Sequence, residues 1–204
     1  MADGCLPLRS WPSRPREELL ARMWEVLDPR LAAGLRAELE GPPPALALDP
    51  GRRVVLVGHR AAGKSRLLPL VAEWLGWPAL DLDRELEGRS GRSLHAWLGA
   101  DPAGFRHAER ELFRTLPPAH VIAAGGGFLS LHGDALSGDV AVLVPISRET
   151  YRERLLADAS RPRLRPDLPL ADELEIVYAD REARHARVAT WSLPAFLRAT
   201  EREP

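Results

Sequence analysis

Hydrophobic positions from residue 52 onwards form short apolar runs that alternate with amphipathic stretches. The apolar runs, several of them rich in β-branched residues, predict strands at residues 54–57, 79–81, 121–123 and 140–145, with a last strand at 190–192. The amphipathic stretches predict helices at residues 64–75, 84–87, 94–98, 102–116, 150–157 and 171–186, and a further helix from Pro194. Because strands and helices alternate, we expect an α/β fold with a parallel sheet and right-handed crossovers.

The first 50 residues follow a different pattern. Their apolar residues recur at helical spacing, in a stripe made of Leu19, Leu20, Met23, Trp24 and Leu27. Asp28-Pro29 predicts a break, a second helical stretch follows at 31–39, and Gly41-Pro42-Pro43-Pro44 is typical of a semi-rigid linker. We therefore expect an N-terminal helical extension and linker over 1–50, ahead of a domain over 51–204. The apolar stripe would pack on that domain, on a second copy of it, or on a partner.

Composition and charge exclude several classes of protein. A hydrophobic content of 45% with 28% charged residues is typical of a folded chain and excludes a mainly disordered one. Lysine and arginine number 28 against 29 acidic residues, so no overall charge attracts nucleic acid or a membrane. No apolar run approaches the roughly 18 residues of a membrane span. The single Cys5 excludes an internal disulfide. We expect a cytoplasmic protein with neither nucleic-acid nor membrane partners.

The segment Gly58-His-Arg-Ala-Ala-Gly-Lys-Ser65 matches the phosphate-loop pattern G-x-x-x-x-G-K-[ST] between a predicted strand and a predicted helix. Such a loop surrounds a phosphate with backbone N–H groups, and the helix N-terminus faces the same anion. Gly63 permits close approach, Lys64 reaches the β- and γ-phosphates, and Ser65 ligates Mg²⁺. Lys64 is the only lysine in the chain, which indicates a position where a compact ammonium is required. The segment predicts binding of ATP or a similar nucleotide.

Two pairs of charged residues are candidates for a site. Asp81 and Asp83 close the second predicted strand, and alternation along a strand directs both carboxylates to one side, toward a metal and a substrate hydroxyl. The alternative is that they cap the following helix. Arg106 and Glu109 are three residues apart on a predicted helix. They belong either to the site or to an ordinary surface ion pair.

Two loops are further candidates. Gly125-Gly126-Gly127 directly follows an apolar strand, and ligands bind at the carboxyl ends of strands in open α/β sheets. A flexible turn would have the same composition. The basic, proline-containing stretch at 160–166 lies between two predicted helices. It is suited to closing over phosphates, although a solvated surface loop would look similar.

In this order and spacing, the features resemble the shikimate kinase family over about residues 52–190. Further matching elements are Gly91-Arg-Ser93, Phe105-Arg106-x-x-Glu109, Arg161-Pro162, and Arg181 ahead of Arg187-Val188-Ala189. The resemblance implies a P-loop kinase with a five-stranded parallel sheet flanked by helices and a mobile lid around 158–170. It also implies phosphorylation of the 3-hydroxyl of shikimate by MgATP, a step in aromatic amino acid biosynthesis.

The resemblance also implies roles for individual residues. Lys64, Asp83 and Arg161 would be catalytic, with Asp83 orienting the hydroxyl and accepting its proton. The implied ATP-binding residues are Ala61, Ala62, Gly63, Lys64, Ser65, Arg66 and Arg161. The implied shikimate-binding residues are Asp83, Arg106, Gly126, Gly127 and Arg181, the two arginines holding the carboxylate. Mg²⁺ would be held by Ser65, with Asp81 assisting through water. The sequence departs from the family at Ala61, where glycine is usual, and at His185, where tyrosine is common.

Two other functions stay open at this point. One is a non-catalytic, ligand-sensing regulatory module with a kinase-like fold, favoured by Ala61 and the extension but opposed by intact Lys64, Asp81 and Asp83. The other is a kinase of a different small hydroxylated metabolite, such as gluconate. For the leading interpretation we expect ATP and shikimate as ligands, and a monomer or weak homodimer.

Overall fold

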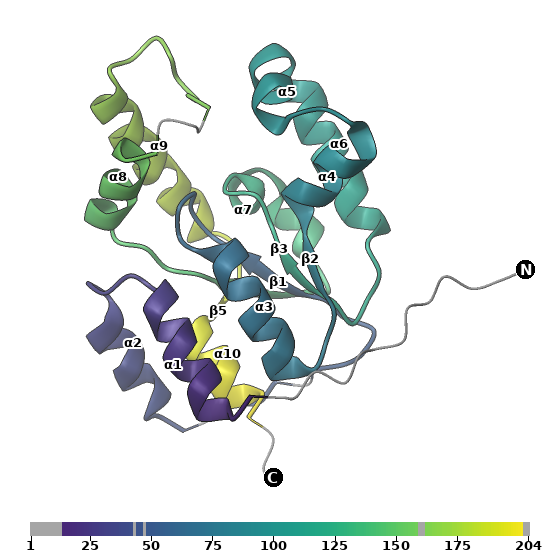
Figure 1. Cartoon of the computed structure of the whole chain (residues 1–204), viewed down its shortest axis with the longest axis vertical. Helices are drawn as coiled ribbons and strands as arrows, with labels where there is room; N and C mark the ends of the chain where they lie inside the picture. Colours follow the sequence, from purple (N-terminus) through teal and green to yellow (C-terminus); the bar gives the residue numbers. More distant parts are fainter. Residues whose placement is uncertain (1–13, 43, 47, 159–161, 202–204) are drawn as a thin grey trace, which may run out of the picture.

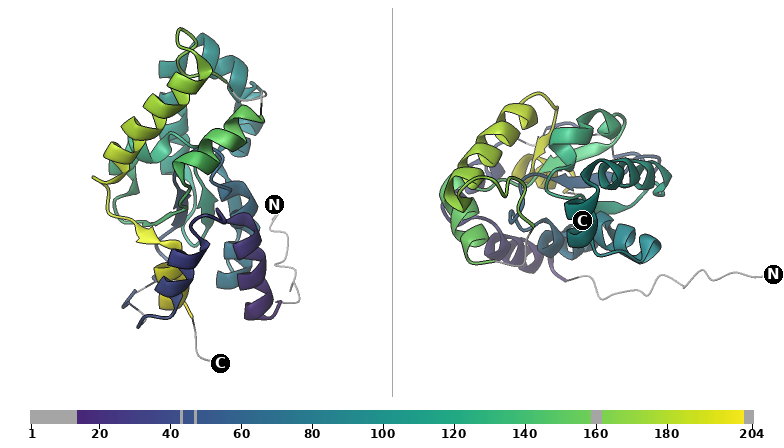
Figure 2. Two further views of the ribbon diagram at one scale, coloured as in Figure 1. Left: turned by 90° about the vertical axis from the view of Figure 1, so that its left-hand side faces the viewer. Right: turned by 90° about the horizontal axis from the view of Figure 1, so that it is seen from above.

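The computed structural model describes residues 14–42, 44–46, 48–158 and 162–201 (Figures 1 and 2). Its centre is one sheet of five strands in the order β2-β3-β1-β4-β5, and every neighbouring pair is parallel. The strands are β1 (Val54–Val57), β2 (Ala79–Asp81), β3 (Val121–Ala123), β4 (Val140–Leu143) and β5 (Trp191–Ser192). The predicted five-stranded parallel sheet is confirmed. The predicted phosphate loop follows β1, the central strand.

Helices cover both faces of the sheet. This buries the side chains of β1, which point alternately to one face and the other. Val54 and Leu56 face one core, while Val55 and Val57 face the other. The first core is covered by α1 (Arg16–Val26), α2 (Ala32–Leu39), α3 (Lys64–Leu75) and α10 (Leu193–Ala199). The second is covered by α4 (Leu82–Ser90), α5 (Leu94–Ala100), α6 (Pro102–Thr115) and α7 (Phe128–His132). The helices α8 (Arg148–Leu156) and α9 (Leu170–His185) flank the predicted lid.

The N-terminal extension is part of the first core. Its apolar stripe is buried, with Leu19, Met23, Val26 and Leu27 each at most 5% exposed. The helix α1 packs against α3, and α2 packs against α10 near the other end of the chain (Figure 1). Of the three packing partners considered for the apolar stripe, the structure shows one: the stripe packs on the chain's own α/β domain.

The structure differs from the predicted elements in two places. The helix after β2 was expected at 84–87 but begins at Leu82, directly after the strand, because Asp81 caps it: Oδ1 accepts a hydrogen bond from the backbone N of Arg84 at 3.3 Å. No element was assigned to residues 128–136, where the structure has α7 and a 3₁₀ turn over Gly133–Leu136. Within the described part of the chain, no helix combines the length and apolar character that crossing a bilayer requires.

Candidate active site

The phosphate loop bends through left-handed backbone at both ends. Gly58 and Gly63 have φ of 129° and 96°, which glycine adopts at little cost. A methyl group at Gly63 would also lie 2.8 Å from Cγ1 of Val26, so the loop touches the N-terminal extension. Ala61 has φ of 60°, a region that costs a residue with a side chain roughly 1–2 kcal/mol. This is the position where glycine is usual in the resembling family, and the conformation explains that preference.

The only lysine of the chain is folded into this loop. Lys64 begins α3 and is buried, and its Nζ donates hydrogen bonds to the carbonyl oxygens of Gly58 at 3.0 Å and His59 at 2.6 Å. An ammonium has three donors on one compact atom, and two of them serve these carbonyls. A planar guanidinium does not fit that arrangement.

A cavity of about 550 Å³ opens beside the loop. Of the residues predicted from the sequence, its wall includes Ala61, Gly63, Lys64, Ser65, Arg66, Asp83, Arg106, Gly126, Gly127 and Arg181. Ala62 and Asp81 are not on the wall, and Ala62 is a buried residue of the loop. Arg161 lies outside the residues that the structure describes. The structure therefore brings most of the predicted site together from the phosphate loop, α3, α4, α6, α9 and the loop after β3.

Asp83 reaches the cavity by a route that differs from the predicted one. It lies in the first turn of α4, not on a strand, so alternation along β2 does not aim it. Burial raises the pKa of Asp83 to about 6, helped by the negative charges of Glu109 and Asp81. The positive charges of Lys64 and Arg106 act in the opposite direction. Asp83 is therefore a carboxylate of unusually high basicity that faces a cationic loop.

The three consecutive glycines leave room for the groups around them. A methyl group at Gly126 would lie 2.8 Å from the backbone N of Arg60, in the phosphate loop. One at Gly125 would lie 2.8 Å from carboxylate oxygens of Asp83 and Glu109, and one at Gly127 would lie 3.1 Å from the guanidinium of Arg106. None of the three has positive φ, so glycine is needed here for close approach. The stretch is part of the site wall.

Arg106 and Arg181 both line the cavity. Arg181 is 8% exposed, and its Nη1 is buried without a hydrogen-bond partner among the described residues. Burial lowers the pKa of Arg181 to about 10, and the nearby positive charges of Arg60 and Arg106 also lower it. Arg106 donates to Glu109 at 2.8 Å, and Glu109 is fully buried, so this is not a surface ion pair. A carboxylate would satisfy the guanidinium of Arg181.

Sequence reasoning missed several residues of the wall. Arg60 donates from Nη2 to the carbonyl of Pro162 at 3.1 Å and so joins the phosphate loop to the predicted lid. Arg154 on α8 donates to the carbonyl of Ala61 at 2.8 Å. Asp158, just after α8, also lines the cavity. Arg60 occupies a variable position of the phosphate-loop motif, and Arg154 and Asp158 lie outside every motif, so the sequence pattern singled out none of the three.

The cavity also holds oxygen donors of the kind that Mg²⁺ prefers. The hydroxyl of Ser65 and the carboxylate of Asp158 line the same wall as Lys64. Asp81, at the end of β2, uses one carboxylate oxygen to cap α4. The donor set of this chain therefore fits a magnesium ion bound together with nucleotide phosphates.

Comparisons with known proteins agree with this geometry. The family model for shikimate kinase matches residues 60–197, which leaves the N-terminal extension outside the match. The shikimate kinase of Caulobacter vibrioides is 36% identical over 144 residues, covering 68% of this chain and 70% of that protein. The structure of shikimate kinase from Acinetobacter baumannii in complex with shikimate has a TM-score of 0.62 and 25% identity, covering 78% of this chain and 86% of that one. The structure from Aquifex aeolicus has a TM-score of 0.59 and 26% identity, with coverages of 72% and 91%. The chain belongs to the shikimate kinase family, as the order and spacing of its motifs predicted.

Proposed function

We propose that this ATP-dependent shikimate kinase transfers the terminal phosphoryl group of ATP to the 3-hydroxyl of shikimate in the cavity beside the phosphate loop. The observation that carries the proposal is the convergence of three groups on one cavity: the phosphate loop, the carboxylate of Asp83, and the guanidinium of Arg181 with its unpartnered Nη1. These groups suit a nucleotide phosphate, a hydroxyl and a carboxylate respectively.

On the nucleotide side, the backbone of residues 61–66 would surround the phosphates at the N-terminus of α3. Lys64 would donate to the transferring phosphoryl group from the position that the carbonyls of Gly58 and His59 give its Nζ. Arg161 is assigned to the same phosphoryl group by the family resemblance. Ser65, with Asp81 through water, would hold Mg²⁺, which neutralises charge on the phosphate oxygens when it is bound.

On the substrate side, Arg106 and Arg181 would hold the carboxylate of shikimate, and Gly126 and Gly127 would lie along its ring. The ion pair between Arg106 and Glu109 keeps the Arg106 guanidinium beside Gly127. Arg181 has no such carboxylate partner among the described residues and would take the larger share of the substrate's charge. This arrangement favours acids with a carboxylate at a fixed distance from the reacting hydroxyl.

The chemical step requires a group that accepts the hydroxyl proton. An oxygen–phosphorus bond forms between the substrate and the γ-phosphoryl group, the bond to ADP breaks, and the proton passes to a carboxylate oxygen of Asp83. A pKa of about 6 leaves Asp83 ionised at neutral pH and basic enough to receive that proton. Enclosure by the lid would exclude water and so limit hydrolysis of ATP.

The first experiment measures ADP release with shikimate, with gluconate, and with a shikimate analogue that lacks the carboxylate. Of the three compounds, we expect only shikimate to be turned over. In the NMR spectrum of the product, we expect phosphorus–proton couplings that assign the phosphate to the 3-hydroxyl. Binding of shikimate and MgATP without ADP release would favour the regulatory module. Preferred turnover of gluconate would favour the other metabolite kinase.

The second experiment tests the proton acceptor. We expect Asp83→Asn to lower turnover by about 10²-fold or more while MgATP binding is retained, because the amide keeps the shape but cannot accept the proton. Asp172→Asn is the matched control, since Asp172 is an exposed carboxylate in the first turn of α9. Near-native turnover of Asp83→Asn would remove this residue from the chemical step.

A further inference from the structure

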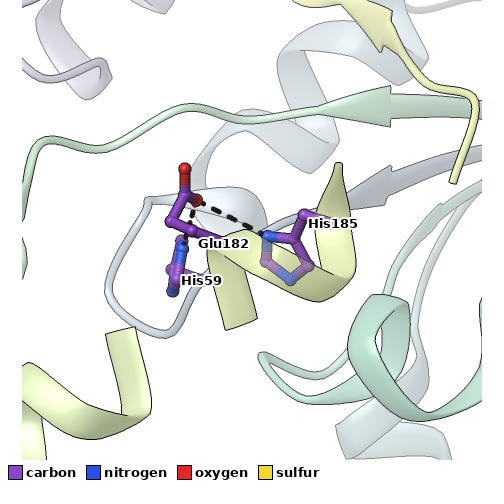
Figure 3. A group of neighbouring side chains, drawn as sticks. All are labelled: His59, Glu182 and His185. Carbon is purple, nitrogen blue, oxygen red and sulfur yellow. Dashed lines mark hydrogen bonds and ion pairs between the residues drawn. The ribbon is translucent and has the colours of Figure 1, made fainter. Parts of the chain in front are cut away.

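A second group of possible metal ligands lies where the phosphate loop meets α9. His59 comes from the loop itself, while Glu182 and His185 are three residues apart on α9 and so share one face of that helix. Figure 3 shows the two imidazole rings next to each other, each joined by a dashed line to the Glu182 carboxylate, and their centroids are 4.8 Å apart. His59 Nε2 lies 2.7 Å and His185 Nδ1 lies 3.8 Å from the same oxygen of Glu182. One ligand atom from each residue falls within 4.8 Å of the others.

The imidazole nitrogens of this cluster are only partly used by the protein, in which His59 Nε2 is hydrogen-bonded to Glu182. The Nδ1 atoms of both histidines are buried and have no hydrogen-bond partner among the residues that the structure describes. Both rings are buried, and burial lowers the pKa of His59 to about 3 and that of His185 to about 4. Neutral imidazole is the form that binds metals. The Glu182 side chain is 52% exposed, so an ion can enter from solvent along it.

Neighbouring residues fix the orientation of each ring. Ser130 Oγ lies 3.0 Å from His185 Nε2, and in the tautomer whose Nε2 donates to this hydroxyl the lone pair is on Nδ1, the nitrogen that faces Glu182. The ring of His59 is stacked on Tyr178 with centroids 4.4 Å apart and meets Tyr151 edge-on at 5.4 Å. Supporting contacts of this kind orient metal-binding histidines and raise metal affinity.

We propose that His59, Glu182 and His185 form a binding site for a divalent transition-metal ion of the Zn²⁺ type. Two imidazoles and one carboxylate suit Zn²⁺ with a coordination position left for water, whereas Mg²⁺ prefers oxygen donors alone. The site is therefore chemically distinct from the oxygen donors around Ser65. A bound ion would join the phosphate loop to α9, the helix that also carries Arg181.

The surrounding charge sets an upper limit to the affinity. Positive charges on Arg181 and Lys64 lower the pKa of His59, and the same charges oppose a metal cation. Glu182 contributes one compensating negative charge, and three ligands make a weaker site than four. We therefore expect saturable binding in the micromolar range. The proposal does not depend on the catalytic roles argued above, because none of its three ligands has one.

The test is a Zn²⁺ titration of the full chain after removal of metals with a chelator, in excess Mg²⁺, followed by competition with a chromophoric chelator. Co²⁺ in place of Zn²⁺ reports nitrogen and oxygen coordination through its visible absorption. We expect one equivalent of Zn²⁺ to bind, and its binding to raise the melting temperature. Glu182→Gln and His185→Gln should each weaken binding by about 10-fold or more.

His107→Gln is the matched control, because His107 is an exposed histidine on α6 outside the cluster. It should bind Zn²⁺ like the unaltered chain. Glu182→Gln alters a half-exposed side chain and is expected to fold, which its melting temperature without metal checks. The proposal is overturned if the unaltered chain shows no saturable binding in excess Mg²⁺, or if Glu182→Gln and His185→Gln bind as tightly as His107→Gln.

Discussion

Asp28 joins the N-terminal extension to the helix that precedes the predicted lid, and its replacement tests whether the extension is a structural part of this kinase. The carboxylate is 1% exposed. Its Oδ2 accepts from the backbone N of Ser147 at 2.7 Å, ahead of α8. Its Oδ1 accepts from Thr150 Oγ1 at 2.8 Å and from the backbone N of Arg30 at 3.0 Å. Removal of the side chain therefore leaves three buried or half-buried donors unpaired.

The size of the effect follows from these contacts. A buried donor left unpaired costs about 1–3 kcal/mol, and Asp28→Ala leaves three donors of which some are only half-buried, so it should lower the unfolding free energy by about 3–5 kcal/mol. At roughly 2–4 °C per kcal/mol for a chain of this size, the melting temperature should fall by about 6–20 °C. Asp28→Asn keeps the oxygen that serves Thr150 and Arg30 but sets an amide N–H₂ against the N–H of Ser147. It should lose about 1.5–3 kcal/mol, the worth of one hydrogen bond to a charged group.

The assay is urea unfolding followed by tryptophan fluorescence, with differential scanning calorimetry for the melting temperature. Glu25→Ala is the control, because Glu25 is an exposed carboxylate three residues earlier and should change stability by at most about 0.5 kcal/mol. Equal effects of Asp28→Ala and Glu25→Ala would refute the reasoning.

The effect of Asp28 also has a predicted pH dependence. Burial acts to raise the pKa of Asp28, but hydrogen bonds from Ser147, Thr150 and Arg30 outweigh it and hold the pKa below 3.8. The folded state therefore binds this proton less readily than the unfolded state does. The stabilisation is fully present above pH 3.8 and is lost as the pH falls through the lowered pKa. The difference between the unaltered chain and Asp28→Asn should shrink in the same interval.

Three further predictions concern the phosphate loop, the glycine stretch and the core. Lys64→Ala should abolish ADP release with little change in melting temperature, and Lys64→Arg should also be severely impaired; near-native turnover of Lys64→Ala would exclude this loop from the chemistry. Gly126→Ala should cost about 1–3 kcal/mol and raise the KM for ATP because its methyl group meets Arg60, whereas Gly88→Ala, with open space around it, should not. Met23→Ala should cost about 2–5 kcal/mol of unfolding free energy; a loss no larger than that of an exposed leucine would contradict its place in the core.

Features that depend on contiguous residues could be predicted from the sequence. The phosphate loop requires only glycines, a lysine and a hydroxyl at fixed spacing between a strand and a helix. The strands were recognisable because a parallel sheet covered on both faces makes their residues apolar in runs. The prediction that Asp83 lies on a strand was wrong because local pattern did not decide the strand's end. The strand β2 has three residues, which is too short for alternation to show where it stops. A capping aspartate then starts the helix early.

The tertiary structure decided which distant residues meet. From the sequence, Arg106 and Glu109 could be either a site pair or a surface ion pair. Only the structure shows that they pack beside the glycine stretch and that Glu109 is fully buried. His59 and Glu182 are 123 positions apart, yet the return of α9 to the end of β1 places their atoms 2.7 Å from each other. The order of crossovers in the sheet determines such contacts. The sequence by itself determined the elements and the phosphate-binding chemistry, because both are local, while packing of the crossover helices assembled the substrate side and the histidine cluster.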